Sequence, residues 1–457
     1  LTVMTFLGAG MLSGISAQVS PLQVDTLEET KIPDQWDLQS CIDYAKEQNI
    51  TIRKNRITAV STQIDVKTAK AAMFPSLSFS TGQQVVNRPY QETSSRVSGS
   101  EIISSNSKTS YNGNYGLNAS WTLYNGNKRL KTIQQEKLNN QMAELDVATS
   151  ENNIQESITQ VYIQILYAAE SVKVNENTLQ VSIAQRDRGQ ELLNAGSIAK
   201  SDLAQLEAQV STDRYQLVTA QATLEDYKLQ LKQLLELDGE NEMNIYLPAL
   251  SDENVLAPLP TKRDVYISAL SLRPEIEASK LNVEASELGI NIAKSSYFPT
   301  ISLSAGIGTN HTSGSDFTFG EQVKNGWNNS IGLSVSVPIF NNRQTKSAVQ
   351  KAKLQYETSI LSLLDEQKAL YKTIESLWLD ANSAQQRYAA ANEKLKSTQI
   401  SYELISEQFN LGMKNTVELL TEKNNLLQAQ QEQLQAKYMA ILNTQLLKFY
   451  QGDQLAL

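Results

Sequence analysis

The 457-residue chain contains a single cysteine, Cys41, and a single histidine, His311. One cysteine cannot form an intrachain disulfide, and it cannot build a Cys-rich zinc or iron–sulfur site. One histidine excludes a multi-histidine metal site and leaves little basis for histidine-based catalysis. The sequence also lacks a nucleotide-binding loop, so we expect a protein that is not an enzyme and needs no cofactor or metal.

Basic charge and aromatic side chains are scarce as well. The chain has 40 Lys and Arg against 49 Asp and Glu, and its net charge of −9 argues against nucleic acid as a partner. Aromatic residues make up 7% of the chain, and the mean hydropathy is −0.35. This composition suits long, thin helices better than a thick globular core.

Long hydrophobic runs are absent except at the N-terminus. Residues 1–17 form a short apolar run that ends in small residues and resembles a secretory signal peptide with a cut after Ala17. A buried N-terminal helix is the alternative interpretation. No other stretch reaches the roughly 18 apolar residues of a membrane helix. The sequence therefore predicts an exported protein that no helix holds in a membrane.

An internal repeat organises the chain. Residues 68–82 and 292–306 are identical at seven of fifteen positions. Two further motif pairs follow in the same order, 120–129 with 336–345 and 192–206 with 408–422; the last pair aligns Gly196 with Gly412. The sequence thus predicts two structural repeats, 18–237 and 261–450, joined by a proline-containing linker at mid-height, 238–260, and followed by a tail, 451–457.

Each repeat is expected to contain a helix, a β-hairpin, a very long helix and a shorter helix. Apolar residues at helical spacing stop before Pro75 and Pro299, and strict alternation of apolar and polar residues follows. A 70-residue helix would span roughly 100 Å and needs lateral coiled-coil packing. The expected ranges are 36–73, about 75–124, 126–195 and 198–237 in the first repeat, and 261–297, about 299–340, 342–411 and 413–449 in the second.

The alternating strands have one apolar face and one face of Ser, Asn and Gly. Leu117, Trp121, Leu333 and Val335 belong to the apolar face. Such a face can pack on a second sheet in a soluble sandwich, or it can meet lipid in an outer-membrane barrel. We favour the lipid-facing reading because the chain has no second sheet to cover four strands. Four strands cannot close a barrel, so closure predicts an oligomer, with eight strands from two copies or twelve from three.

With this architecture the chain resembles the TolC-like outer-membrane efflux family. The resemblance rests on the duplicated pattern, the strand-start motifs FPSLS and FPTIS, and the glycine-containing tips NAGSIAKSDL and NLGMKNTVEL. It implies a mainly α trimeric channel-tunnel, in which a long α-helical coiled-coil barrel joins a twelve-stranded outer-membrane β-barrel built from four strands per chain. The expected location is the bacterial cell outer membrane, extending into the periplasm.

The resemblance implies a function and a set of partners. The protein would be the exit duct of a tripartite efflux pump or a type I secretion system, conducting small molecules or proteins. Its partners would be two further copies of itself in a homotrimer, outer-membrane lipid, a periplasmic adaptor protein and an inner-membrane transporter of the RND, ABC or MFS type. A non-channel periplasmic or surface coiled-coil adaptor or scaffold is the alternative; it accounts for the helices and leaves the duplicated hairpins unexplained.

The resemblance also implies a gate at the periplasmic tips, which Gly196 and Gly412 mark. The family's basic gate residue corresponds to Lys414, and its hydroxyl–aspartate partner corresponds to Ser201–Asp202. Lysine replaces the family's arginine, so the planar bidentate contact is lost.

Two further tip positions bear on the gate and the lumen. A tyrosine of the family is Phe409 here, which removes a hydroxyl contact. Glu418 matches the first position of an acidic ring that selects cations in the lumen, while Thr421 replaces the second acidic residue. The simpler interpretation is that Lys414, Asp202 and Glu418 are ordinary solvated charges at the helix tips, without a role in a gate or a lumen.

Overall fold

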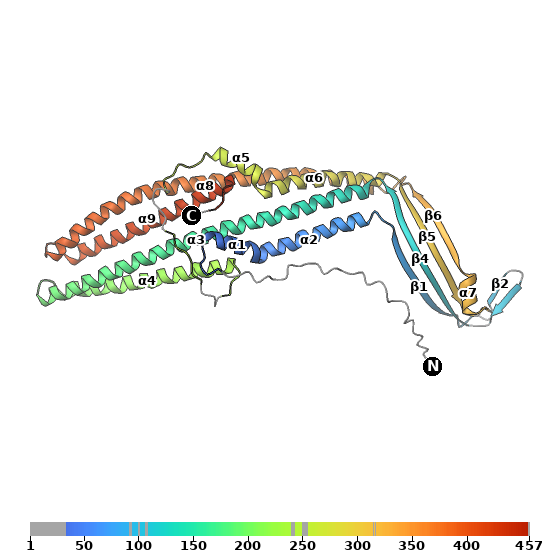
Figure 1. Cartoon of the computed structure of the whole chain (residues 1–457), viewed down its shortest axis with the longest axis horizontal. Coiled ribbons are helices and arrows are strands. Elements are labelled where there is room, and N and C mark those ends of the chain that lie inside the picture. The colour runs from blue at the N-terminus through green and yellow to red at the C-terminus, as the bar shows by residue number, and fades with distance from the viewer. Residues whose placement is uncertain are drawn as a thin grey trace.

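The computed structural model describes residues 33–90, 94–98, 101–105, 108–238, 243–248, 255–313, 315 and 317–455. The predicted signal peptide, 1–17, lies outside these residues. The chain is elongated, with a sheet at one end and helices along the rest of its length (Figure 1). None of the helices in the described ranges is long and apolar enough to cross a membrane.

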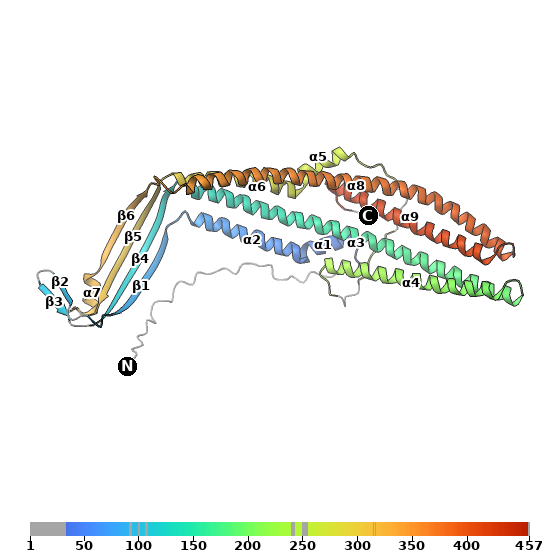
Figure 2. The same ribbon diagram turned by 180° about the vertical axis from the view of Figure 1, so that it is seen from behind.

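Two long helices run along most of the helical part of the structure, and shorter helices lie end to end beside each of them (Figures 1 and 2). The long helices α3 and α8 both contain 67 residues. The first repeat contains α1 (Leu38–Gln48), α2 (Ile50–Ala71), α3 (Lys128–Asn194) and α4 (Lys200–Leu234). The second contains α5 (Lys262–Leu272), α6 (Pro274–Lys294), the 3-10 turn η2 (Ser295–Tyr297), α8 (Gln344–Asn410) and α9 (Thr416–Gln451).

The helix that precedes each hairpin is broken, where the sequence pattern predicts one continuous helix. Asn49 is extended between α1 and α2, and its side chain caps α2 by accepting from the amides of Thr51 and Ile52. Arg273 is extended between α5 and α6 because the residue before Pro274 avoids the helical region. The same break therefore has a different local cause in each repeat.

The sheet has the order β1–β4–β5–β6 with all neighbours antiparallel. Its strands are β1 (Ser76–Asn87), β4 (Thr109–Asn125), β5 (Thr300–Thr312) and β6 (Asn328–Ser336). Each repeat contributes one hairpin, and β4 pairs with β5 to join them. Among the described residues, β1 and β6 each have one edge without a partner strand. The second hairpin, predicted to reach residue 340, ends at Ser336, before Pro338, which has no amide hydrogen for the ladder.

The loops at the far end of the sheet carry elements that the sequence pattern does not predict. A small separate hairpin pairs β2 (Ser94–Ser98) with β3 (Glu101–Ser105) between β1 and β4. A short helix, α7 (Phe319–Asn325), lies between β5 and β6, and Thr318 and Glu321 cap its N-terminus reciprocally.

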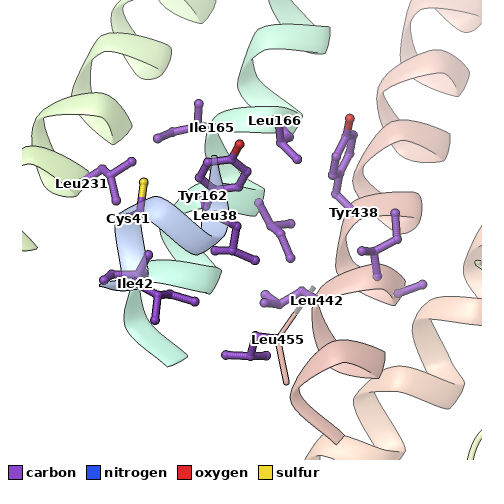
Figure 3. Close-up of a cluster of buried hydrophobic side chains, with 14 of the residues drawn as sticks. Leu38, Cys41, Ile42, Tyr162, Ile165, Leu166, Leu231, Tyr438, Leu442 and Leu455 are labelled. Carbon is purple, nitrogen blue, oxygen red and sulfur yellow. The ribbon is translucent and has the colours of Figure 1, made fainter. Parts of the chain in front are cut away.

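The main apolar core lies at mid-height, where α1, α3, α4, α8 and α9 meet (Figure 3). The fully buried side chains there include Cys41, Ile42, Tyr162, Ile165 and Leu231. Burial raises the pKa of the Cys41 thiol to about 12, so Cys41 acts as a small hydrophobic residue. The described part of the linker also reaches this level, because Trp36 bonds to the backbone of Asn244 and Tyr246.

Candidate functional site: the sheet face and the helical tips

The apolar face of the sheet is open in the described chain. Trp121, Leu303 and Leu333 lie side by side across β4, β5 and β6. The four residues predicted to face lipid are exposed, at 39% for Leu117, 38% for Trp121, 65% for Leu333 and 57% for Val335. A contiguous apolar face of this kind marks a surface that meets lipid or another protein.

The opposite face of the sheet carries small polar side chains. The hydroxyls of Ser76 and Ser120 lie 2.8 Å apart across β1 and β4, and the Asn118 amide donates to Ser80 at 3.3 Å. These side chains bond to one another across the strands. The face can therefore line a water-filled space.

His311 lies on the apolar face near the loop end of β5. Its ring contacts the rings of Tyr111, Tyr115 and Phe319, with centroids 5.1 to 5.9 Å away. No group of three or more His, Cys, Asp or Glu side chains that could hold a metal occurs among the described residues. His311 is thus part of an aromatic cluster that packs α7 against the sheet.

The two helical tips have the same backbone structure. Gly196 and Gly412 have φ values of +73° and +76°, a left-handed conformation that favours glycine. In each tip the amide after the glycine donates to a carbonyl five residues earlier, at 2.8 Å. This is the Schellman ending of a helix, so the alignment of the two glycines in sequence corresponds to one shared turn.

The acidic residues of the tips have a structural role in capping. The Asp202 carboxylate accepts from the Ala199 amide at 3.0 Å, and the Glu418 carboxylate accepts from the Asn415 amide at 3.2 Å. Asp202 and Glu418 occupy equivalent positions, the third residue of α4 and of α9. A carboxylate there satisfies a free amide and interacts favourably with the helix dipole.

Lys414 does not contact Asp202 within one chain. Among the described residues, its ammonium forms an ion pair with Glu418, at 2.6 Å. The hydrogen bond from Lys414, followed by that from the Asn415 amide, lowers the pKa of the Glu418 carboxyl, which therefore stays ionised. Ser201 is exposed and Phe409 is buried. The structure thus brings together two of the predicted tip residues, in a pairing that the sequence did not suggest.

A buried charge cluster lies above the tips, where sequence reasoning placed no site. Lys423 of α9 forms an ion pair with Asp213 of α4 and bonds to the hydroxyl of Ser182 in α3. Lys423 is 3% exposed and Asp213 is 1% exposed. Burial lowers the pKa of Lys423, and the bond to Asp213 opposes that shift.

The sequence does contain a signal for this cluster. Lys423 interrupts an apolar stripe at helical spacing that includes Leu419 and Leu426, and Asp213 follows Leu206 and Val210 in the same way. A charge within such a stripe points towards the coiled-coil interface and not towards solvent. Removing one partner of a buried ion pair typically costs about 3–5 kcal/mol, against about 0–1 kcal/mol for an exposed pair.

A second buried charge cluster lies at the break between α5 and α6. The Arg273 guanidinium bonds to Glu156 of α3 at 2.9 Å and to Glu275 at 2.8 Å. It also lies over the ring of Tyr450 in α9, 4.1 Å from the centroid. Arg273 is 6% exposed and thereby connects helices of both repeats.

Comparison with solved structures shows the fold. The outer membrane protein VceC from Vibrio cholerae is 15% identical, with a TM-score of 0.74 over 92% of this chain and 97% of that chain. CusC is 18% identical, with a TM-score of 0.77 over 91% of this chain and 92% of that chain. The predicted fold class, long helices with a four-stranded sheet in each chain as in TolC-like channel-tunnels, is confirmed.

Curated relatives match over a shorter length. The outer membrane efflux protein BepC of Brucella suis is 24% identical over 299 residues, which cover 65% of this chain and 62% of BepC. The outer membrane protein TolC of Escherichia coli is 24% identical over 291 residues, which cover 62% of this chain and 58% of TolC. The matches thus span about three fifths of the length of these relatives.

The profile of the family described as "Outer membrane efflux protein" matches two ranges, 41–236 and 265–452. The first range runs from α1 to the end of α4, and the second runs from α5 to the end of α9. The two matches therefore fall on the two predicted repeats and together cover most of the chain. On this evidence, the chain belongs to the outer membrane efflux protein family.

Proposed function

We propose that the chain is one subunit of an outer-membrane exit duct, which passively conducts cargo from the periplasm to the exterior. The observation that carries this proposal is a sheet with an exposed apolar face and a polar opposite face, joined to two 67-residue helices. Family membership places the protein in the outer membrane. There the apolar face would meet lipid, and the polar face would line the passage.

The unpaired edges of β1 and β6 support a closed ring of several copies. An unpaired strand edge in lipid leaves backbone groups without partners, which costs several kcal/mol for each group. Pairing β6 of one copy with β1 of the next satisfies both edges. Three copies give a twelve-stranded barrel, which leaves a passage. Two copies give an eight-stranded barrel, and side chains would fill its interior. We therefore propose a homotrimer.

The proposed duct works within a larger assembly. A passive duct has no energy source of its own, so an inner-membrane transporter, of the RND, ABC or MFS type, would drive the cargo through a periplasmic adaptor. The small Ser and Asn side chains of the polar sheet face offer little basis for selecting one cargo. We propose that the transporter sets the choice between drugs, other small molecules and secreted proteins.

Two measurements on the purified protein test the proposed function. Samples from outer-membrane fractions should migrate as a trimer until heated, and the trimer should conduct ions in planar lipid bilayers. A monomer that stays in the aqueous phase and gives no conductance would instead support the coiled-coil scaffold reading.

The proposed gate contact is between copies. Within one chain Lys414 bonds to Glu418 and not to Asp202, so we propose that a Lys414–Asp202 contact is made to the tip of a neighbouring copy. We expect Lys414→Ala and Asp202→Ala each to raise single-channel conductance in planar bilayers. An exposed pair is worth about 0–1 kcal/mol, and three copies could together shift the opening equilibrium up to about 100-fold. The double change should add little to either single change; full additivity would contradict a direct contact.

The Lys414–Glu418 pair predicts opposite changes in ion selectivity. Lys414→Ala removes the cation that neutralises Glu418, so cation preference should rise. Glu418→Ala leaves Lys414 unpaired, so cation preference should fall. Reversal potentials in a salt gradient measure both effects, and Thr421→Ala serves as an uncharged control. The same shift for Lys414→Ala and Glu418→Ala would show that the tips do not line the conducting path.

A further inference from the structure

We propose that Lys423, Asp213 and Ser182 form a latch that holds the α8–α9 hairpin against the α3–α4 hairpin. In this proposal the latch, and not the exposed charges of the tips, is the main restraint within each subunit that keeps the periplasmic end closed. The inference rests on the proposed duct function and adds a regulating element to it.

The latch lies between the tips and the core at mid-height. Ser182 is 14 residues before Gly196, and Lys423 is 11 residues after Gly412. At 1.5 Å per residue, these spacings place the cluster roughly 16–21 Å above the tips. The cluster is therefore well placed to control whether the two hairpins separate below the core.

The contacts of the latch cross from one hairpin to the other. The Lys423 ammonium bonds to the Asp213 carboxylate and the Ser182 hydroxyl, and Ser182 also donates to Asp213. The second carboxylate oxygen of Asp213 accepts from Gln209 at 2.9 Å. Three helices, α3, α4 and α9, thus meet at one buried carboxylate whose two oxygens both have partners.

Exposed ion pairs nearby cannot restrain the hairpins in this way. Lys414–Glu418 joins the turn before α9 to the first turn of α9, and Lys394–Glu432 joins α8 to α9. Both pairs stay intact when the hairpin α8–α9 moves as a unit. Separation at the latch, in contrast, leaves a lysine and an aspartate without their partners in a site that was closed to water.

Two neutral hydrogen bonds accompany the latch between the hairpins. Gln209 donates to Asn424 at 3.3 Å, and Gln185 donates to the Tyr402 hydroxyl at 2.9 Å. Water can replace either bond with little loss, because hydrogen bonds between neutral groups contribute modestly to stability. The buried ion pair is the contact that water replaces least well, which is why we assign the restraint to it.

Single-channel recording of the purified full-length protein tests the proposal. Lys423→Met and Asp213→Asn each leave one buried charge unpaired, and we expect each to raise the open probability about ten-fold or more. The double variant Lys423→Met/Asp213→Asn should have an open probability no higher than that of either single variant, because the two residues share one contact. Ser182→Ala removes only a hydroxyl, should fold normally, and is expected to raise the open probability about two- to ten-fold.

The matched control is Lys394→Met, which breaks an exposed ion pair inside the α8–α9 hairpin and should leave the open probability unchanged. Each variant is first checked for heat-sensitive trimers, so that loss of folding is not read as opening. Unchanged open probability in folded Lys423→Met and Ser182→Ala trimers, or effects that multiply in the double variant, would overturn the latch. A wild-type protein without any conductance would instead overturn the duct.

Discussion

Replacing Leu117 or Leu333 by arginine is expected to prevent assembly in the outer membrane. Leu117 pairs with Ile307 in the middle of the sheet, and Leu333 lies on the same face in β6. An arginine near the midplane of the bilayer costs roughly 2–4 kcal/mol in a membrane barrel. In a homotrimer one substitution introduces three such charges, so the cost should exceed what assembly can tolerate. The yield of heat-sensitive trimers in outer-membrane fractions measures this effect.

The neighbouring residue Asn118 supplies the matched control. It lies next to Leu117 on β4 and points to the opposite, polar face. Asn118→Arg should therefore assemble normally and alter conductance. If Leu117→Arg and Asn118→Arg assembled equally well, the apolar face would not be in contact with lipid.

Arg273→Met is expected to destabilise the helical part strongly. It leaves the partly buried carboxylates of Glu156 and Glu275 without their buried cation, which should cost about 3–5 kcal/mol. Thermal unfolding of the trimer in detergent, followed by the helical circular dichroism signal, measures the loss. Lys280→Met removes an exposed pair with Glu277 and should change the stability by only about 0–1 kcal/mol.

The loss in Arg273→Met should also depend on pH. Burial raises the pKa of Glu156 even in the presence of Arg273, which opposes the shift. Without Arg273 the folded-state pKa rises further, so the folded protein binds a proton more readily than the unfolded chain. Stability then falls as the pH rises above the ordinary carboxyl range and recovers as the pH falls. The loss of stability in Arg273→Met should be smaller at about pH 5 than at about pH 7.5. An equal loss at both pH values would show that the ionised Glu156 carboxylate is not its cause.

The features predicted from sequence are those that leave a repeated pattern. Gly196 and Gly412 align in the sequence, and both adopt the same left-handed turn. Alternation along β4 predicts which side chains share a face, because a strand has a period of two residues. Pro274 was available as a sign of the break before α6, but apolar residues at helical spacing continue across it and hide it.

The charged sites were harder to predict. Lysine and aspartate in a helix are usually exposed, so Lys423 and Asp213 look ordinary until three helices are placed together. The family resemblance drew attention to Lys414 and Asp202, whose contacts within the chain are local. Which charge is buried depends on packing between residues that are more than 200 positions apart in sequence.

The position of the apolar core has a mechanical consequence. The helices are clamped at mid-height, and the paired helices below it extend as a cantilever with one fixed end. From Leu166 to Asn194 this arm is 28 residues, or about 40 Å at the rise of an α-helix. A tilt of about 5° at the clamp would displace the tip by about 3.5 Å, which is more than the length of a hydrogen bond. In the proposed duct, leverage of this kind would convert a small rotation at the level of the linker into a displacement of the tips large enough to break a hydrogen bond between them.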